Sequence, residues 1–237
     1  MSENIKNVIE IRNVGRVFKT PGGEFTALSD INAQVPESTL TILKGHSGSG
    51  KTTLLNIIGA LDDPTSGEVI IDGKSLNDLS ERKKDDVRRT QMGFVFQSVS
   101  LIPSLTAYQN VEFSLRMAGI RKNRKKRAEE CLKTVGLGNR MNHYPAEMSG
   151  GEQQRVAIAR AMAHQPRIIL ADEPTAELDS MMAAEVTRVL KELTRKEGIT
   201  VIMTTHDVGL MDAGDYIIEL EGGRCINIKS GQDSEIQ

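Results

Sequence analysis

The octapeptide GHSGSGKT, residues 45–52, limits the folds open to this chain more than any other stretch. It matches the pattern G-x-x-x-x-G-K-[ST] and joins a strand-like run (TILK, residues 41–44) to a helix-like run (TTLLNIIGAL, residues 52–61). In such a loop the backbone N–H groups surround phosphates, the lysine reaches the β- and γ-phosphates, and the final hydroxyl binds Mg²⁺. The sequence therefore predicts a site for a nucleoside triphosphate and Mg²⁺. The expected nucleotide-binding residues are Gly45, His46, Ser47, Gly48, Ser49, Gly50, Lys51, Thr52 and Thr53, of which Thr52 also binds the metal.

Short apolar runs on both sides of this loop predict strands. The runs are VIEIRNV (8–14), ALSDINAQV (27–35), TLTILKG (39–45), GEVIIDG (67–73), GFVFQ (93–97), RIILAD (167–172) and ITVIMTTH (199–206). Turn residues such as Pro21, Gly22 and Gly23 separate the early runs, and the later ones alternate with helical patterns, as in a parallel sheet buried on both faces. Near the end of the chain, YIIELEGGRCINI predicts a hairpin around Gly222 and Gly223. The chain is expected to be an α/β protein.

Polar side chains stand at the ends of these strands, where α/β folds present groups to a ligand. Asp172 and Glu173 end a buried strand, a costly place for two carboxylates without a cation. We expect Asp172 to hold Mg²⁺ through water and Glu173 to orient and deprotonate an attacking water molecule. Gln97 is the expected contact to Mg²⁺ or water, and His206 the expected contact to the γ-phosphate.

The stretch MSGGEQQR, residues 148–155, predicts the start of a helix. Ser149 and Glu152 fit the S-x-x-E capping box, in which each side chain accepts from a backbone N–H at the helix start. Capping does not explain Gly150 and Gly151, because each glycine in the first turn costs roughly 0.5 to 1 kcal/mol relative to alanine. A helix start attracts anions, so the glycine pair indicates a second anion site.

Charge, aromatic content and cysteine spacing indicate which kinds of partner and which cell compartment to expect. The chain has 30 basic and 32 acidic residues and only 3% aromatic residues, so it lacks the basic surplus and stacking rings typical of nucleic-acid binders. Cys131 and Cys225 match no metal spacing, as for reduced thiols in a cytoplasmic protein. No run of 18 apolar residues occurs, and MSENIKNVIE lacks the pattern of a signal peptide. A cytoplasmic location is expected, with any membrane role depending on a separate partner.

Between the strands, residues 98–148 have a helical pattern. Thr106 is placed to cap a helix whose Val111, Leu115 and Ala118 share one face. The run RKNRKKR, residues 121–127, fits either a solvated helical face or a contact with anionic lipid or a partner.

Taken together, the motifs stand in the order seen in ATP-binding-cassette ATPases, and the chain resembles that family over nearly its whole length. MSGGE resembles the family's signature sequence, with Glu152 where glutamine is commonest and Met148 where leucine is. AELD, residues 176–179, is similar to the D-loop and supplies Asp179. Phe18 in GRVFKT stands where an aromatic ring stacks on adenine. By this resemblance the catalytic residues are Lys51, Gln97, Glu173 and His206, the metal residues Thr52, Gln97 and Asp172, and the signature residues Ser149, Gly150, Gly151 and Glu152.

The resemblance also implies an architecture. A P-loop NTPase (RecA-like) core with a mostly parallel sheet is expected to carry an antiparallel β subdomain and an inserted α-helical subdomain. Residues 1–237 would then form one ATPase domain. Its catalytic core and β subdomain would comprise residues 1–97 and 149–237, and residues 98–148 would form a helical subdomain that docks a permease.

Three stretches, SGSGKTTLLNIIGALDDPTSGEV, GFVFQSVSLIPSLTAYQNVEF and MSGGEQQRVAIARA, are similar to the lipoprotein-releasing and macrolide-export branch of the family. This implies an ATP-hydrolysing subunit, peripheral on the inner face of the membrane, that drives an integral membrane permease for export. Two ATPase subunits, expected to be identical, would pack head to tail around two ATP molecules, with the signature of one closing on the γ-phosphate held by the other. A mechanotransmitting or sensing ATPase that moves no substrate is the alternative. Family members of DNA repair carry a long coiled-coil insertion, and translation factors carry two cassettes; this chain shows neither feature.

Overall fold

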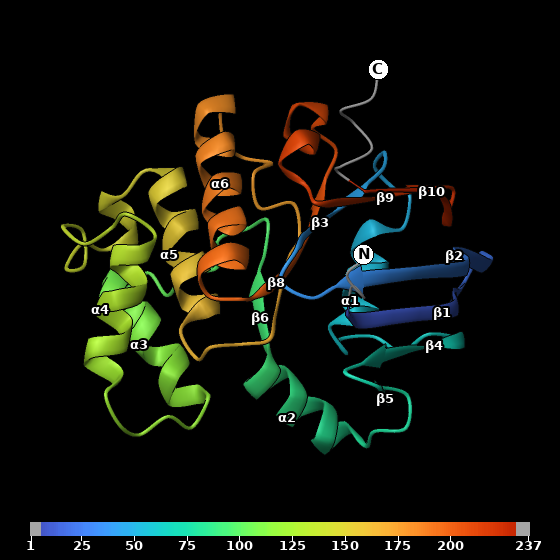
Figure 1. Cartoon of the computed structure of the whole chain (residues 1–237), viewed down its shortest axis with the longest axis horizontal. Coiled ribbons are helices and arrows are strands. Elements are labelled where there is room, and N and C mark those ends of the chain that lie inside the picture. Colours follow the sequence, from blue (N-terminus) through green and yellow to red (C-terminus); the bar gives the residue numbers. More distant parts are fainter. Residues whose placement is uncertain (1–5, 231–237) are drawn as a thin grey trace, which may run out of the picture.

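Residues 6–230 are described by the computed structural model of this chain, and they form two β-sheets with helices around them (Figure 1). The strands are β1 Asn7–Thr20, β2 Gly23–Pro36, β3 Leu40–Lys44, β4 Ser66–Ile71, β5 Lys74–Ser75, β6 Met92–Val95, β7 Ile168–Ala171, β8 Thr200–Thr205, β9 Tyr216–Glu221 and β10 Arg224–Ser230. The helices are α1 Lys51–Ile58, α2 Glu81–Gln91, α3 Ala107–Met117, α4 Arg124–Thr134, α5 Gly150–Met162, α6 Ser180–Lys196 and the 3₁₀ helices η1 Pro145–Glu147 and η2 Val208–Ala213.

The larger sheet has six strands in the order β10-β9-β3-β8-β7-β6 and is parallel except at one edge. Strands β9, β3, β8, β7 and β6 pair in parallel, and β10 is antiparallel to β9. In β3, Ile42 belongs to the core shared with α5 and α6, whereas Leu43 belongs to the core shared with α1 and β1. Burial on both faces is the reason that these strands are uninterrupted apolar runs. The predicted mostly parallel sheet is confirmed.

The smaller sheet, in the order β2-β1-β4-β5, is antiparallel, as predicted. Its β1–β2 hairpin is longer than the strands expected over residues 8–14 and 27–35. Pairing runs out to Thr20 opposite Gly23, through irregularities of register near Val14 and Arg16. The outer part of the hairpin is largely exposed, so it has no apolar alternation for a sequence pattern to detect.

Helices α3 and α4 lie between β6 and α5 in the sequence and pack against each other and against α5, on the side of α5 that faces away from the small sheet (Figure 1). Thr106 caps α3 through a capping box with Gln109, and Val111 and Leu115 are fully buried, as predicted. Within residues 6–230 no helix is long and apolar enough to cross a membrane.

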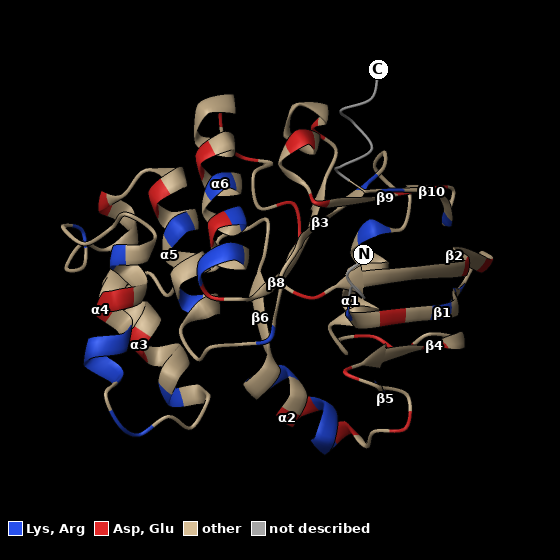
Figure 2. Ribbon diagram, viewed as in Figure 1, with Lys and Arg blue, Asp and Glu red and all other residues tan. Residues whose placement is uncertain are grey.

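Figure 2 shows Lys and Arg gathered at the start of α4 and in the connection that precedes it. Three of these cations have partners inside the protein, one of them Lys126, whose Nζ lies 3.9 Å from Glu130 Oε1. Arg124 Nε donates to Glu112 Oε1 at 2.7 Å, and Arg127 Nε donates to the Ala163 carbonyl at 3.1 Å. Lys125 and Lys126 are exposed. The run is therefore partly structural, and both interpretations of its remaining charges stay predictions.

Candidate functional site: a phosphate loop facing two carboxylates

The loop between β3 and α1 has a backbone path that only glycine permits at two positions. Gly50, the residue before α1, has φ +101°, and a Cβ there would meet Leu28 Cδ2 at 2.7 Å and the Ala27 carbonyl at 2.8 Å. A Cβ on Gly45 would lie 2.4 Å from both the Leu220 carbonyl and Ser49 Oγ. The loop is thus pressed against β2 and β9, which fixes its backbone N–H groups at the start of α1.

Lys51 is the first residue of α1, and its side chain is 4% exposed. Its ammonium group donates to the carbonyl oxygens of Gly45 at 2.8 Å and His46 at 3.1 Å, so the lysine bends back over its own loop. The same Nζ lies 3.7 Å from Glu173 Oε1. The other carboxylate oxygen of Glu173 lies 3.4 Å from His206 Nδ1. The structure therefore brings Lys51, Glu173 and His206 together, and Glu173 stands between the two basic groups.

Asp172 follows β7 directly and faces the start of α1. Its Oδ1 accepts from the Thr52 hydroxyl at 3.0 Å and from the Thr204 hydroxyl at 2.8 Å. The Thr204 oxygen in turn accepts from the backbone N–H of Glu173 at 2.7 Å. Glu173 has φ 43°, a left-handed conformation that a non-glycine residue adopts at a cost of order 1–3 kcal/mol and that surrounding contacts must hold in place. Thr204 supplies one of those contacts.

Sequence reasoning missed Thr204. It is fully buried in β8, two positions before His206, in a strand that otherwise fits a plain apolar run. The available signal was the pair of threonines at the end of VIMTT, because a buried hydroxyl needs a hydrogen-bond partner.

The donors at this site suit a nucleoside triphosphate and Mg²⁺. Ser49 Oγ is buried and has no hydrogen-bond partner within residues 6–230, which leaves a donor free inside the loop. The Thr52 hydroxyl and the Asp172 carboxylate are adjacent hard oxygen ligands, the kind that Mg²⁺ prefers. No group of three or more His, Cys, Asp or Glu in the described residues is placed to hold a metal. Mg²⁺ is usually bound by one or two protein ligands together with phosphate oxygens and water, and this donor set has that character.

Gln97 lies outside this set of contacts. The sequence predicts that it ends a strand, but β6 stops at Val95 and Gln97 is exposed two residues further along. Because β6 pairs with β7 in parallel, with Val95 opposite Ala171, Gln97 follows the same edge of the sheet as Asp172. Its predicted contact with Mg²⁺ or water stays a prediction.

The stretch MSGGE forms the start of α5. Ser149 Oγ accepts from Glu152 N at 3.2 Å, and Glu152 Oε2 accepts from Ser149 N at 2.9 Å, which completes the predicted capping box. The Ser149 N–H is the main cause of a lowered pKa at Glu152, and the nearby charge of Arg140, 3.2 Å from Glu152 Oε1, lowers this pKa further. The carboxylate is thus directed back to the cap and to Arg140.

The two signature glycines pack against the segment that carries Asp179. A Cβ on Gly151 would lie 3.2 Å from Met182 Cε, and one on Gly150 would lie 3.4 Å from Leu178 Cδ2. Asp179 caps α6 by accepting from Met182 N at 2.9 Å. Small residues at 150 and 151 therefore also serve packing within one chain, a reason that the sequence alone did not provide.

Phe18 lies in the outer part of β1 and is half-buried. The strand register places Arg16 opposite Leu28 and Phe18 opposite Phe25. Leu28 is one of the residues that Gly50 touches, so Phe18 stands two strand positions outward from the contact between the hairpin and the phosphate loop. At about 3.3 Å per residue this offset is about 7 Å.

Comparison with known proteins agrees with this geometry. The family model described as "ABC transporter" matches residues 28–176. The chain is 47% identical over 221 residues to the uncharacterized ABC transporter ATP-binding protein MJ0796 of Methanocaldococcus jannaschii, covering 91% of this chain and 94% of that protein. It is 41% identical to the lipoprotein-releasing system ATP-binding protein LolD 2 of Caulobacter vibrioides (91% and 95% covered). It is 42% identical to the macrolide export ATP-binding/permease protein MacB of Bartonella quintana (95% of this chain, 34% of that protein).

A solved structure gives the same result. The dimeric, post-hydrolysis structure of the cassette MJ0796 bound to ADP and Pi superposes with a TM-score of 0.84 and 43% identity, covering 94% of this chain and 98% of that one. ADP and Pi are the products of ATP hydrolysis. The carboxylates, the lysine and the phosphate loop described above are groups that such a reaction requires. The chain therefore belongs to the ABC transporter family, as an ATPase that binds ATP with Mg²⁺.

Proposed function

We propose that two copies of this chain pack head to tail around two ATP molecules, and that the closed pair drives a membrane permease for export. The observation that carries the pairing is the direction of the signature contacts. Within residues 6–230, the hydrogen bonds and the ion pair of Ser149 and Glu152 join them to each other, to Gln153 and to Arg140, and none is to residues 45–53. A second helix start that attracts anions but does not serve the chain's own phosphate loop is free to meet the nucleotide of a partner subunit. The solved dimer of MJ0796 supports the pairing of two copies.

Within each nucleotide site, the contacts support the roles proposed for Lys51, Thr52, Asp172, Glu173 and His206, and the family resemblance supports those of Gln97 and Phe18. Lys51 exchanges its two carbonyl partners for the β- and γ-phosphate oxygens, which are stronger acceptors because they are charged. Thr52 and, through water, Asp172 would hold Mg²⁺, which would neutralise phosphate charge, and Gln97 would contact Mg²⁺ or water. Glu173, placed between Lys51 and His206, orients a water molecule and takes its proton, while His206 contacts the γ-phosphate. Phe18 stacks on adenine.

The helical subdomain, residues 98–148, is proposed as the part that meets the permease. A groove of about 480 Å³ lies where α3 meets the core, and its lining includes Phe96, Phe113 and Met117 together with Arg88, Arg89 and Arg160. These apolar side chains are 41%, 42% and 61% exposed, which is unusual for residues of this size. Phe96 precedes Gln97 in the chain, so a partner bound in this groove would lie next to the segment that carries Gln97. The protein would thereby lie at the inner face of the membrane.

Export, as opposed to import, is supported by the names of two relatives, LolD and MacB. They are 41% and 42% identical to this chain. The direction follows from the permease, because the ATPase touches ATP and the permease and does not touch the cargo.

Purification from native membranes in mild detergent tests the proposal. We expect an integral membrane protein to co-purify with the wild-type chain and to be lost with Phe113→Asp, because a charge in the groove opposes apolar docking. Ile226→Asp is the matched control, since Ile226 is 54% exposed on β10. Co-purification with nucleic acid and without a membrane protein would contradict the proposal.

A further inference from the structure

The outer face of β1 carries a cation placed on an aromatic ring. The Arg16 guanidinium carbon lies 4.5 Å from the centre of the Phe18 ring, within the range of a cation–π contact. Arg16 and Phe18 are two positions apart on one strand, and so their side chains project to the same face of the sheet. One face of the Phe18 ring is therefore occupied within the chain itself.

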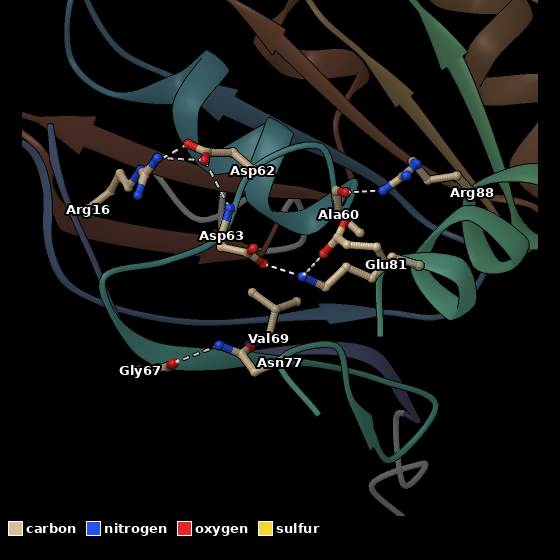
Figure 3. Close-up of polar contacts among 10 residues, drawn as sticks. Arg16, Ala60, Asp62, Asp63, Gly67, Val69, Asn77, Glu81 and Arg88 are labelled. Carbon is tan, nitrogen blue, oxygen red and sulfur yellow. Dashed lines mark hydrogen bonds and ion pairs between the residues drawn. The ribbon is translucent and has the colours of Figure 1, made fainter. Parts of the chain in front are cut away.

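Arg16 is held there by a bidentate ion pair. Its Nε donates to Asp62 Oδ2 at 2.9 Å and its Nη2 donates to Asp62 Oδ1 at 2.6 Å, as Figure 3 shows. Both partners are only about a quarter exposed. Two parallel hydrogen bonds fix the plane of the guanidinium as well as its position, which a single contact would leave free to rotate.

Asp62 is itself anchored from the other side. Its Oδ1 also accepts from the backbone N–H of Asp63 at 2.9 Å (Figure 3). Asp63 pairs in turn with Lys84 Nζ at 2.6 Å. Lys84 is 7% exposed and also contacts Glu81, and these hydrogen bonds raise its pKa, so it stays charged at neutral pH. The turn that follows α1 is thus attached to α2, and Arg16 is attached to that turn.

We propose that Arg16 is a positioning residue of the base site: it covers one face of the Phe18 ring, so that the base of the bound nucleotide stacks on the opposite face. The inference rests on the proposed stacking of adenine on Phe18. A guanidinium behind the ring draws electron density from it, which strengthens stacking of an electron-rich purine in front. The same contact stops the ring from turning away from the nucleotide. Arg16 thereby favours ligands that carry a base over ligands that carry only phosphates.

The test compares ATP with inorganic tripolyphosphate, which has the phosphates of ATP without the base. For Arg16→Gln we expect the KM for ATP to rise about two- to fivefold, with kcat unchanged. A change of this size corresponds to the loss of one cation–π contact at an exposed site. Inhibition of the ATPase by tripolyphosphate should keep the wild-type inhibition constant. Asp62→Asn, which leaves the cation but loosens its orientation, should move the KM for ATP in the same direction by less.

Arg12→Gln is the matched control. Arg12 lies on the same strand and pairs with Glu10 and Glu68, so the variant makes the same change of charge away from Phe18. Its KM for ATP should equal that of the wild type. In a Phe18→Ala background, Arg16→Gln should have no additional effect, because the contact through which it acts is already gone.

The outcomes separate this inference from the assignment of Phe18. If Phe18→Ala leaves the KM for ATP unchanged, the proposed stacking of adenine on Phe18 is wrong. If Phe18→Ala raises the KM and Arg16→Gln does not, only the role of Arg16 is overturned. A rise in the tripolyphosphate constant equal to the rise in KM would also overturn it, since the effect would then lie in the phosphate loop or in the fold. If Arg16→Gln folds poorly, Arg16→Lys replaces it in the comparison of ATP with tripolyphosphate. Because lysine keeps the positive charge, the expected rise in the KM for ATP is smaller.

Discussion

One hydroxyl group, that of Thr204, connects Asp172 with the backbone of Glu173. It donates to Asp172 Oδ1 at 2.8 Å and accepts from Glu173 N at 2.7 Å, and it does so from a fully buried position in the neighbouring strand. The two carboxylates at the end of β7 are therefore set relative to each other by a residue that touches neither nucleotide nor metal in the proposed mechanism.

Thr204→Val removes this hydroxyl while keeping the shape of the side chain. The Glu173 N–H then loses a partner in a buried place, which we expect to destabilise the fold by about 1–3 kcal/mol and to lower kcat by about tenfold or more. Thr41→Val is the control on a core strand. Thr41 Oγ1 is buried with no hydrogen-bond partner within residues 6–230. Its removal should therefore stabilise the fold by about 1 kcal/mol. Urea unfolding and steady-state ATPase rates measure both. Wild-type turnover in Thr204→Val would show that Thr204 does not orient the two carboxylates.

Lys51→Ala should abolish nucleotide binding. The lysine provides the buried cation of the loop, and the loss of charge-assisted hydrogen bonds to phosphate should weaken ATP affinity by about a hundredfold or more. Titration calorimetry gives the affinity directly. Lys44→Ala, at the end of β3 just before the loop, should bind ATP normally because Lys44 pairs with Glu219, away from the phosphates. Unchanged affinity in Lys51→Ala would refute the assignment of the loop.

Glu173→Gln should retain ATP binding and stop hydrolysis. The amide keeps the size of the side chain but cannot take the proton of water, and removing a general base lowers kcat by about 10² to 10⁴. Because ATP is then bound and not consumed, size-exclusion chromatography with Mg²⁺ and ATP should show a stable dimer. Glu221→Gln, an exposed carboxylate at the end of β9, should turn over ATP at the wild-type rate as a monomer–dimer mixture. Normal hydrolysis by Glu173→Gln would show that another group is the base.

How far the sequence could predict this site depends on whether a residue's role is local. The phosphate loop and the capping box of Ser149 with Glu152 are set by spacings of a few residues, and a sequence shows such spacings directly. The convergence of Asp172, Glu173 and His206 could be predicted because the ends of parallel strands share one edge of a sheet.

Contacts between distant segments could not be predicted in this way. Thr204 reaches Asp172 across a pair of strands, and Met182 reaches Gly151 across two helices, so neither pairing leaves a pattern along the chain. The strands predicted for the β1–β2 hairpin are too short and leave out Phe18. The reason is that strand pairing continues past the point where apolar alternation stops. The sequence predicts Gln97 at the end of a strand because Phe96 extends the apolar run one residue beyond Val95, the last residue of β6.

Glu152→Gln should be tolerated at neutral pH. Glutamine also accepts from Ser149 N, and the lost ion pair with the half-exposed Arg140 is worth about 0–1 kcal/mol. The pKa of Glu152 is lowered in the folded protein, mainly by the Ser149 N–H, so its contribution to stability is present above the ordinary pKa of 4.5 and is lost as the pH falls through the folded value. Urea unfolding at pH 7 and pH 4 should therefore show a smaller loss of stability on acidification in Glu152→Gln than in the wild type. Complete loss of ATPase activity at pH 7, with the fold intact, would show instead that the charge of Glu152 acts on the partner's nucleotide.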